Sequence, residues 1–289
     1  MSLNTISKNS IGLTNKWSVW KIILQIFMIS AAIVFIYPAV FVLINAFKFD
    51  AEITTNPIGL PSVFTLENFR RVLTVSGDGV TFYKALLNTI IIAVFSVTGI
   101  ILISSMAAWA LVRHKGKLSG FLFIFFAFFL IIPFQVIMVP LVVLATDMSS
   151  MSILGLIFMY WGLGAPVGVF FYHGFIKGVP ATLEESASID GAGPFRTFFQ
   201  VVFPLLTSIT VTVGILDIIW VWNDFLLPFI ILKKGTLVLF QFSNFTGTFS
   251  TDYGGQTASL VLTATPVIIL FLSLQKYYIK GIAAGAVKG

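Results

Sequence analysis

Cysteine is absent from this chain of 289 residues, and charged residues are scarce, at 10% of the sequence. The first absence excludes disulfide bonds and thiolate-bound metals. The second argues against a soluble domain, which would carry about 25% charged residues. The sequence also lacks the phosphate-binding motif G-x-x-x-x-G-K-[ST] and the catalytic motifs H-E-x-x-H and G-x-S-x-G. The chain therefore cannot hold a nucleotide in a P-loop, and nothing in it indicates an enzyme.

Long apolar runs take the place of the missing charge. Hydrophobic residues make up 58% of the chain, and the mean hydropathy is +1.02. Runs of about 20 apolar residues can cross the hydrocarbon core of a bilayer as helices, and continuous runs disfavour a β-barrel. The pattern predicts an all-α transmembrane bundle of six helices in a single domain, 1–289. The predicted spans are 19–47, 85–112, 118–144, 152–175, 201–222 and 258–278, and the third contains Pro133 and Pro140 as kinks.

Lysine and arginine are distributed unevenly between the predicted loops. Eleven of the 17 fall on one side, and the net charge of +6 therefore indicates membrane topology; without any long basic run, nucleic-acid binding is not expected. By the positive-inside rule, both termini and the loops 113–117 and 176–200 are cytoplasmic. We expect a multi-pass protein of a prokaryotic inner membrane. The eleven are Lys8, Lys16, Lys21, Arg113, Lys115, Lys117, Lys177, Arg196, Lys276, Lys280 and Lys288.

Two longer segments, 48–84 and 223–257, fall on the opposite side. Thr65-Leu66-Glu67-Asn68 in the first reads as the start of a short surface helix. The second is rich in glycine, threonine, serine and aromatic residues and has no clear periodicity. Either segment could contact an external partner or serve as a solvated connector.

The cytoplasmic segment 176–200 has the pattern of a helix–turn–helix. Thr182 and Glu185 have the spacing of a capping box, which predicts a helix over 183–189. Gly191 can adopt the positive φ that ends such a helix, and Pro194 suits the first turn of the next. That second helix would carry Phe195, Phe198 and Phe199 toward the membrane.

This element could lie on lipid headgroups or bind a protein. Amphipathic connectors are common in membrane proteins. However, Glu184, Glu185 and Asp190 outnumber Lys177 and Arg196, and the cytoplasmic leaflet is itself anionic. An acidic, capped element with a glycine turn suits a protein partner better than lipid.

The same segment resembles the EAA loop of ABC-importer permeases. That pattern reads E-A-A, three residues, G, nine residues, I-x-L-P; here it is met by Glu185-Ser186-Ala187, Gly191 and Val201-Val202-Phe203-Pro204. Ser186, Val201 and Phe203 depart from the pattern conservatively. Ile189-Asp190-Gly191-Ala192 and the tail 280–289 are similar to the MalG-like subgroup of binding-protein-dependent carbohydrate transport permeases.

The resemblance implies that residues 183–192 are a coupling helix that docks on a cytoplasmic ATPase. The coupling residues would be Glu184, Glu185, Ala187, Asp190, Gly191 and Ala192, and the tail, Gly285 to Gly289, would lie near the ATPase dimer interface. It also implies a second permease subunit, as a heterodimer, and an extracytoplasmic solute-binding protein. This chain would bind no cofactor, and ATP and Mg would be bound by the ATPase.

One predicted span carries a polar stripe. Asp217, Trp220 and Asp224 share a helix face, with Asn223 to one side. An acid within a span is costly and usually faces a cavity or a partner. Aromatic faces, carboxylates and amides bind sugars, so these four residues are candidates for the substrate path. The alternative is an interfacial aromatic belt with Asp217 hydrogen-bonded between helices.

The sequence therefore predicts a transmembrane permease subunit of an ATP-driven ABC importer for carbohydrate. The alternatives are an importer of an amino acid or another small polar solute and, from another class, a secondary transporter. His114 and His173 lie far apart in sequence, so no metal site is expected.

Overall fold

The computed structural model describes residues 19–77, 79–247 and 251–286. Four of its helices are long and apolar enough to cross a membrane, and two bent pairs bring the number of spans to six when each pair is counted once. The four are α1 (Val19–Asn45), α4 (Phe82–Arg113), α7 (Ile153–Ile176) and α14 (Tyr253–Ala286). Their bounds agree to within a few residues with the segments 19–47, 85–112, 152–175 and 258–278 predicted as spans, although α14 extends further at both ends.

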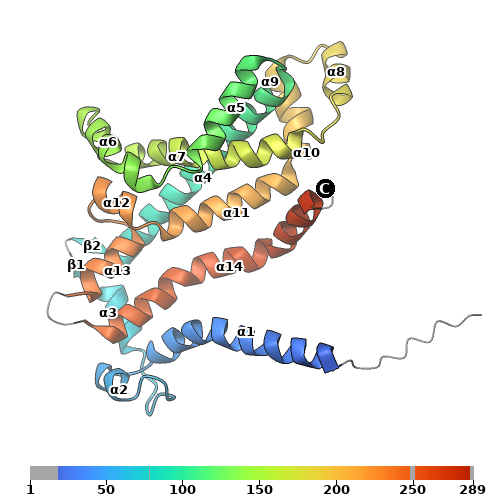
Figure 1. Ribbon diagram of the computed structural model, residues 1–289. Coiled ribbons are helices and arrows are strands. Elements are labelled where there is room, and N and C mark those ends of the chain that lie inside the picture. The colour runs from blue at the N-terminus through green and yellow to red at the C-terminus, as the bar shows by residue number, and fades with distance from the viewer. Residues whose placement is uncertain (1–18, 78, 248–250, 287–289) are drawn as a thin grey trace, which may run out of the picture.

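Figure 1 shows α4, α7, α11 and α14 running between two groups of short helices. Helices α8 to α10 lie at one end, and α2, α3, α12 and α13 at the other. Helix α1 packs against α14, and the most apolar stretch of α1 is not buried by any described part of the chain. A helix that is apolar all round and unburied needs lipid or another protein chain around it.

The closest helix pair is α4 and α7. A Cβ atom on Gly164 or Gly168 of α7 would collide with Ile100 or Ser104 of α4, so both glycines permit the close approach. Ser104 Oγ also donates a hydrogen bond to the backbone carbonyl of Ala165, at 3.3 Å. The two helices therefore behave as one packed unit.

The third predicted span, 118–144, is wrong as a single kinked helix. Helices α5 (Lys117–Phe129) and α6 (Phe134–Asp147) meet at an angle of 101° across a short break. Pro133 lies in extended backbone at the N-terminal cap of α6, and only Pro140 is inside a helix. Proline disfavours the helical conformation in the residue before it and has no N–H to donate, so the chain breaks here.

The fifth predicted span, 201–222, also begins in the wrong place. Helix α9 (Pro194–Thr197), the π-helix η1 (Phe198–Val202) and α10 (Phe203–Leu205) form one arm, bent by 81° from α11 (Thr207–Asn223). Pro204 cannot donate a helical hydrogen bond, and the π-helix stands directly before it. The part of the span that runs in the direction of α11 therefore starts at Thr207.

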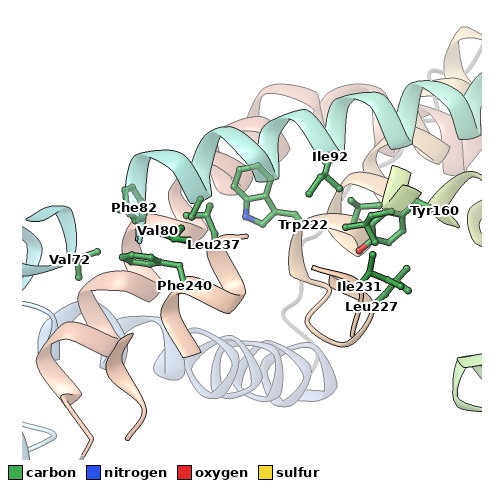
Figure 2. Packing of buried hydrophobic residues seen from close by; sticks show 14 of the residues in the cluster. Val72, Val80, Phe82, Ile92, Tyr160, Trp222, Leu227, Ile231, Leu237 and Phe240 are labelled. Carbon is green, nitrogen blue, oxygen red and sulfur yellow. The ribbon is translucent and has the colours of Figure 1, made fainter. Parts of the chain in front are cut away.

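The segment 223–257 contains two short helices that the sequence pattern does not reveal. Helix α12 (Leu226–Ile231) and helix α13 (Leu237–Phe245) bury Leu227, Leu237 and Phe240. Figure 2 shows these side chains with Trp222 and Tyr160 in the hydrophobic cluster at this end. The sequence of this segment shows no clear periodicity because both helices are too short to show one.

The 48–84 segment lies at the same end of the molecule as α12 and α13. It contains α2 (Asp50–Thr55), α3 (Glu67–Thr74) and an antiparallel pair, β1 (Ser76–Gly77) and β2 (Val80–Thr81). Helix α3 confirms the helix predicted to begin near Thr65. The Arg71 guanidinium lies 3.4 Å from Asp50 Oδ2 and 2.9 Å from Asp252 Oδ2. Because Asp252 directly precedes α14, this cluster ties α2 and α3 to the start of α14.

Candidate functional site

The segment predicted to be cytoplasmic is a helix–turn–helix, as the spacing predicts. Helix α8 spans Thr182–Ile189, and Gly191 has φ +79° in the turn that follows. Ala192 N donates to Ala187 O at 2.9 Å, which closes the end of the helix. Pro194 is then the first residue of α9. The predicted roles of Gly191 and Pro194 in the backbone are both confirmed.

The predicted capping box is wrong. Ala181 already has helical backbone angles, and no side chain caps α8. The amides of Glu184 and Glu185 donate to Ala181 O, at 2.9 and 3.1 Å. Because the helical turn begins one residue early, Thr182 lies inside the first turn, where its hydroxyl has no early amide to accept from.

Glu184 instead reaches back to the C-terminal end of α4. Its Oε2 accepts a hydrogen bond from Trp109 Nε1 at 2.9 Å, and its Oε1 lies 2.7 Å from Arg113 NH2. The side chains of Arg113 and Glu184 are only 20% and 13% exposed. Of the predicted coupling residues, Glu184 therefore belongs to an internal contact.

The other predicted coupling residues leave an open surface on α8. Glu185, Asp190 and Gly191 are exposed, while Ala187 and Ala192 are half-buried. Ile189 is 86% exposed, although its side chain is large and apolar. Acids beside exposed apolar side chains form a surface suited to a protein partner. The end of the tail, 287–289, lies outside the described residues.

The second candidate region surrounds a cavity of about 260 Å³. Trp220 and Asp224 line it, together with residues of α5, α6, α7 and α12. Leu130 and Ile132, from the break between α5 and α6, also line it. Irregular backbone at membrane depth is tolerated where it faces a cavity, so the break and the cavity fit together.

The four predicted path residues do not all meet at this cavity. Asp224 Oδ2 accepts a hydrogen bond from the Tyr160 hydroxyl at 2.9 Å, and the Tyr160 ring stands edge-on to Trp220 at 5.3 Å. Asn223 is exposed and donates to its own helix at Ile219 O. Asp217 is 3% exposed, is absent from the cavity wall, and its Oδ2 has no hydrogen-bond partner among the described residues.

Sequence reasoning missed Tyr160, Trp109 and Arg113 as site residues. Tyr160 is surrounded by apolar residues in the sequence, so only the fold brings its hydroxyl to Asp224. Arg113 reads as one of several loop cations, yet it follows Trp109 by four residues and so shares its helix face. Across residues 19–77, 79–247 and 251–286, no group of three or more histidine or acidic side chains could hold a metal ion.

Comparison with known proteins gives one family match. The model of the family "Binding-protein-dependent transport system inner membrane component" matches residues 99–283. That range contains α7 to α13 and both candidate regions.

Several similar proteins are permeases. The probable starch degradation products transport system permease protein AmyC of Thermoanaerobacterium thermosulfurigenes is 36% identical, covering 94% of this chain and 99% of the relative. The multiple sugar-binding transport system permease protein MsmG of Streptococcus mutans is 34% identical, covering 93% and 96%. The melibiose/raffinose/stachyose import permease protein MelC of Bacillus subtilis is 34% identical, covering 79% and 83%.

The fold also has a counterpart among solved structures. A chain from the crystal structure of a bacterial ABC transporter involved in the import of the acidic polysaccharide alginate superposes with a TM-score of 0.77. The match covers 90% of this chain and 96% of that chain, at 19% sequence identity. At this identity the likeness concerns the fold.

Proposed function

We propose a function on the premise that this chain belongs to the family of binding-protein-dependent transport system inner membrane components. The chain is the transmembrane permease subunit of an ABC importer for carbohydrate, most specifically for oligosaccharides. The observation that carries the proposal is its identity of 34–36% to sugar permeases over almost its whole length. The names of the relatives refer to starch degradation products, multiple sugars and melibiose, raffinose and stachyose.

A separate ATPase subunit drives the transport. The absence of a P-loop motif from the sequence supports this, because the chain has no element that could hold nucleotide phosphates. The exposed acids and Ile189 on α8 provide the docking surface. ATP and Mg belong to the ATPase, and this chain performs no hydrolysis.

The substrate path passes the cavity between α5, α6, α7 and α11. Trp220 offers an aromatic face for the C–H surface of a sugar ring, and Asp224 offers a carboxylate for its hydroxyls. Tyr160 holds Asp224 in place from α7. Asn223 and Asp217 lie away from the cavity wall, so we assign them no direct contact in this conformation.

The chain requires two further protein partners besides the ATPase. A second, different permease subunit completes the transport pathway, and a solute-binding protein delivers sugar to the outer end. The unburied α1 supports a requirement for lipid or another chain on that face. Both termini lie in the cytoplasm, as the distribution of lysine and arginine indicates.

Co-purification and uptake together test the proposal. Tagged chain should bring down an ATPase subunit, and replacing exposed Glu185 with arginine should weaken that association. Uptake of labelled di- and trisaccharides by the reconstituted complex should require ATP. A chain that purifies without an ATPase and takes up solute on an ion gradient is a secondary transporter, and preferential uptake of amino acids would refute the carbohydrate assignment.

A further inference from the structure

The contact between α8 and α4 has a consequence for coupling that rests on the proposed function. Arg113 Nε donates to Glu184 Oε1 at 2.8 Å, and Arg113 NH2 also donates to Val179 O at 3.0 Å. The guanidinium thus holds both α8 and the chain that leads into it. Charge-assisted hydrogen bonds of this kind are shorter and stronger than neutral ones.

Trp109 connects the second arm to the same place. Its indole N–H bonds Glu184 in α8, and its ring lies 5.4 Å from the Phe198 ring in η1. Phe198 is fully buried and belongs to a cluster with Ile176, Val202 and Ile209. Both arms of the helix–turn–helix are therefore attached to one face of α4.

We infer that Trp109 and Arg113 form a clamp that makes α8 move with α4 as a rigid body. Force applied to α8 reaches α4 directly, and α4 is packed on α7 through Gly164 and Gly168. Helix α7 carries Tyr160, which bonds Asp224 at the cavity. The alternative route runs through the turn at Gly191, the π-helix and the 81° bend before α11, and it changes direction before it reaches that helix.

The clamp makes Trp109, Arg113 and Glu184 positioning residues for energy coupling. They need not touch the ATPase, the nucleotide or the sugar. Loss of one partner leaves the other charge half-buried and unpaired, so α8 would separate from α4 while its outward surface stays intact. ATPase docking and substrate binding would then persist while transmission fails.

The test compares Arg113→Ala and Glu184→Ala with Lys115→Ala, an exposed cation two residues beyond Arg113. Each variant is reconstituted in proteoliposomes with the ATPase, the second permease and the binding protein. We expect the ATP consumed per sugar transported to rise about tenfold in the first two variants, in keeping with the loss of one charge-assisted bond. Lys115→Ala should keep the wild-type ratio, and Arg113→Lys, which keeps a cation beside Glu184, should lie between wild type and Arg113→Ala.

A distance measurement provides the structural readout. Spin labels on Ser188→Cys and His114→Cys, both exposed, report the separation of α8 and α4 in a chain that has no other cysteine. The distribution should stay narrow with and without ATP in the unaltered clamp and broaden in Arg113→Ala. If Arg113→Ala does not fold, Trp109→Phe can be used instead. It removes the indole N–H but keeps an aromatic ring at this position, and the same broadening is expected.

Different results would refute the clamp and the proposed function. A wild-type ATP-to-sugar ratio and a narrow distance distribution in the clamp variants, with the ATPase still bound, would overturn the clamp alone. An unmodified chain that binds no ATPase would overturn the proposed function.

Discussion

Glu184 and Glu185 are adjacent in sequence, yet the fold gives them opposite surroundings. Glu184 is held by an indole and a guanidinium, whereas Glu185 is exposed on α8. One of two neighbouring acids therefore secures the helix from within, and the other remains available to a partner. Substituting Glu184 or Glu185 alone can therefore separate the attachment of α8 from the binding of a partner.

The turn after α8 requires at Gly191 a backbone conformation that favours glycine. Its φ of +79° is rarely adopted by other residues, and no atom lies near its missing side chain. Gly191→Val should therefore strain the backbone by about 1–2 kcal/mol without a steric collision. We expect more ATP hydrolysed per sugar transported, measured in proteoliposomes. Gly193, at φ −71° and equally open, supplies the control Gly193→Ala, which should transport normally; normal coupling in Gly191→Val would contradict the role of the turn.

Trp220 and Asp224 should determine uptake without determining assembly. Trp220→Ala and Asp224→Asn remove the aromatic face and the charge from the cavity wall. We expect sugar uptake to fall about tenfold or more, while the amount of assembled complex is unchanged. Asn223→Ala is the matched control because the Asn223 side chain, among the residues that the structure describes, bonds only its own helix. Equal uptake in all three variants would remove the cavity from the substrate path.

Glu52, in α2, should contribute a pH-dependent stability. The amide and hydroxyl of Ser62 donate hydrogen bonds to its carboxylate and hold the pKa of Glu52 below its ordinary value of 4.5. A carboxyl with a lowered pKa stabilises the fold above its unfolded pKa, and this stability is lost as the pH falls through the folded pKa. The Tm difference between wild type and Glu52→Gln should thus exist at neutral pH and vanish in acid. A difference that is constant from pH 7 to below 4 would contradict this.

Among the elements, polar contacts at helix ends connect α2, α3 and the start of α14. Arg71 of α3 bridges Asp50 of α2 and Asp252, next to α14, and Asp50 Oδ1 also accepts from Gly254 N at 2.7 Å. Asn68 Nδ2 donates to the carbonyls of Ala46 and Lys48. Segments about 200 positions apart in sequence are joined by these polar contacts.

Arg71→Ala should loosen the attachment of α3 to α14. It leaves two carboxylates facing each other without a cation, and we expect a loss of about 1 kcal/mol, since the pair is partly exposed and screened. The Tm in detergent at low and high salt measures this. Arg70→Ala is the control, because Arg70 is exposed and its one ion pair within the described part of the chain is with Glu67, at 3.9 Å. Equal Tm values for the two variants would show that the cluster adds no stability.

Long elements could be predicted from the sequence, and breaks between elements could not. The apolar runs of α1, α4, α7 and α14 decide their own helicity, and Gly191 and Pro194 have local backbone requirements. The breaks at Pro133 and before Thr207 depend on what surrounds them: a cavity in the first case and a buried Phe198 cluster in the second. The internal role of Glu184 was hidden for a similar reason, since Trp109 and Arg113 lie more than 70 positions away.

In the molecule as a whole, the two candidate regions lie toward opposite ends of the long helices, and α4 and α7 connect them. Figure 1 shows α8 near one end of these helices and α12 near the other. The packed pair α4 and α7 links the two regions without passing through the bent arm α9–α10.

The proposed orientation predicts which surfaces are reachable from each side of the membrane. In a chain without native cysteine, a single Ser62→Cys should react with a membrane-impermeant maleimide on intact cells. Ser188→Cys should react only after permeabilisation. Labelling in the reverse pattern would overturn the assignment of both termini to the cytoplasm.

The clamp between α4 and α8 sets the boundaries of a transplantable module. Its parts are 106–115 and 179–204, which are discontinuous in sequence. A chimaeric permease that receives only the second segment would acquire Glu184 beside a foreign α4 end, without its own tryptophan and arginine. Grafting both segments together preserves the clamp, so exchanging ATPase partners between permeases requires a two-piece transfer.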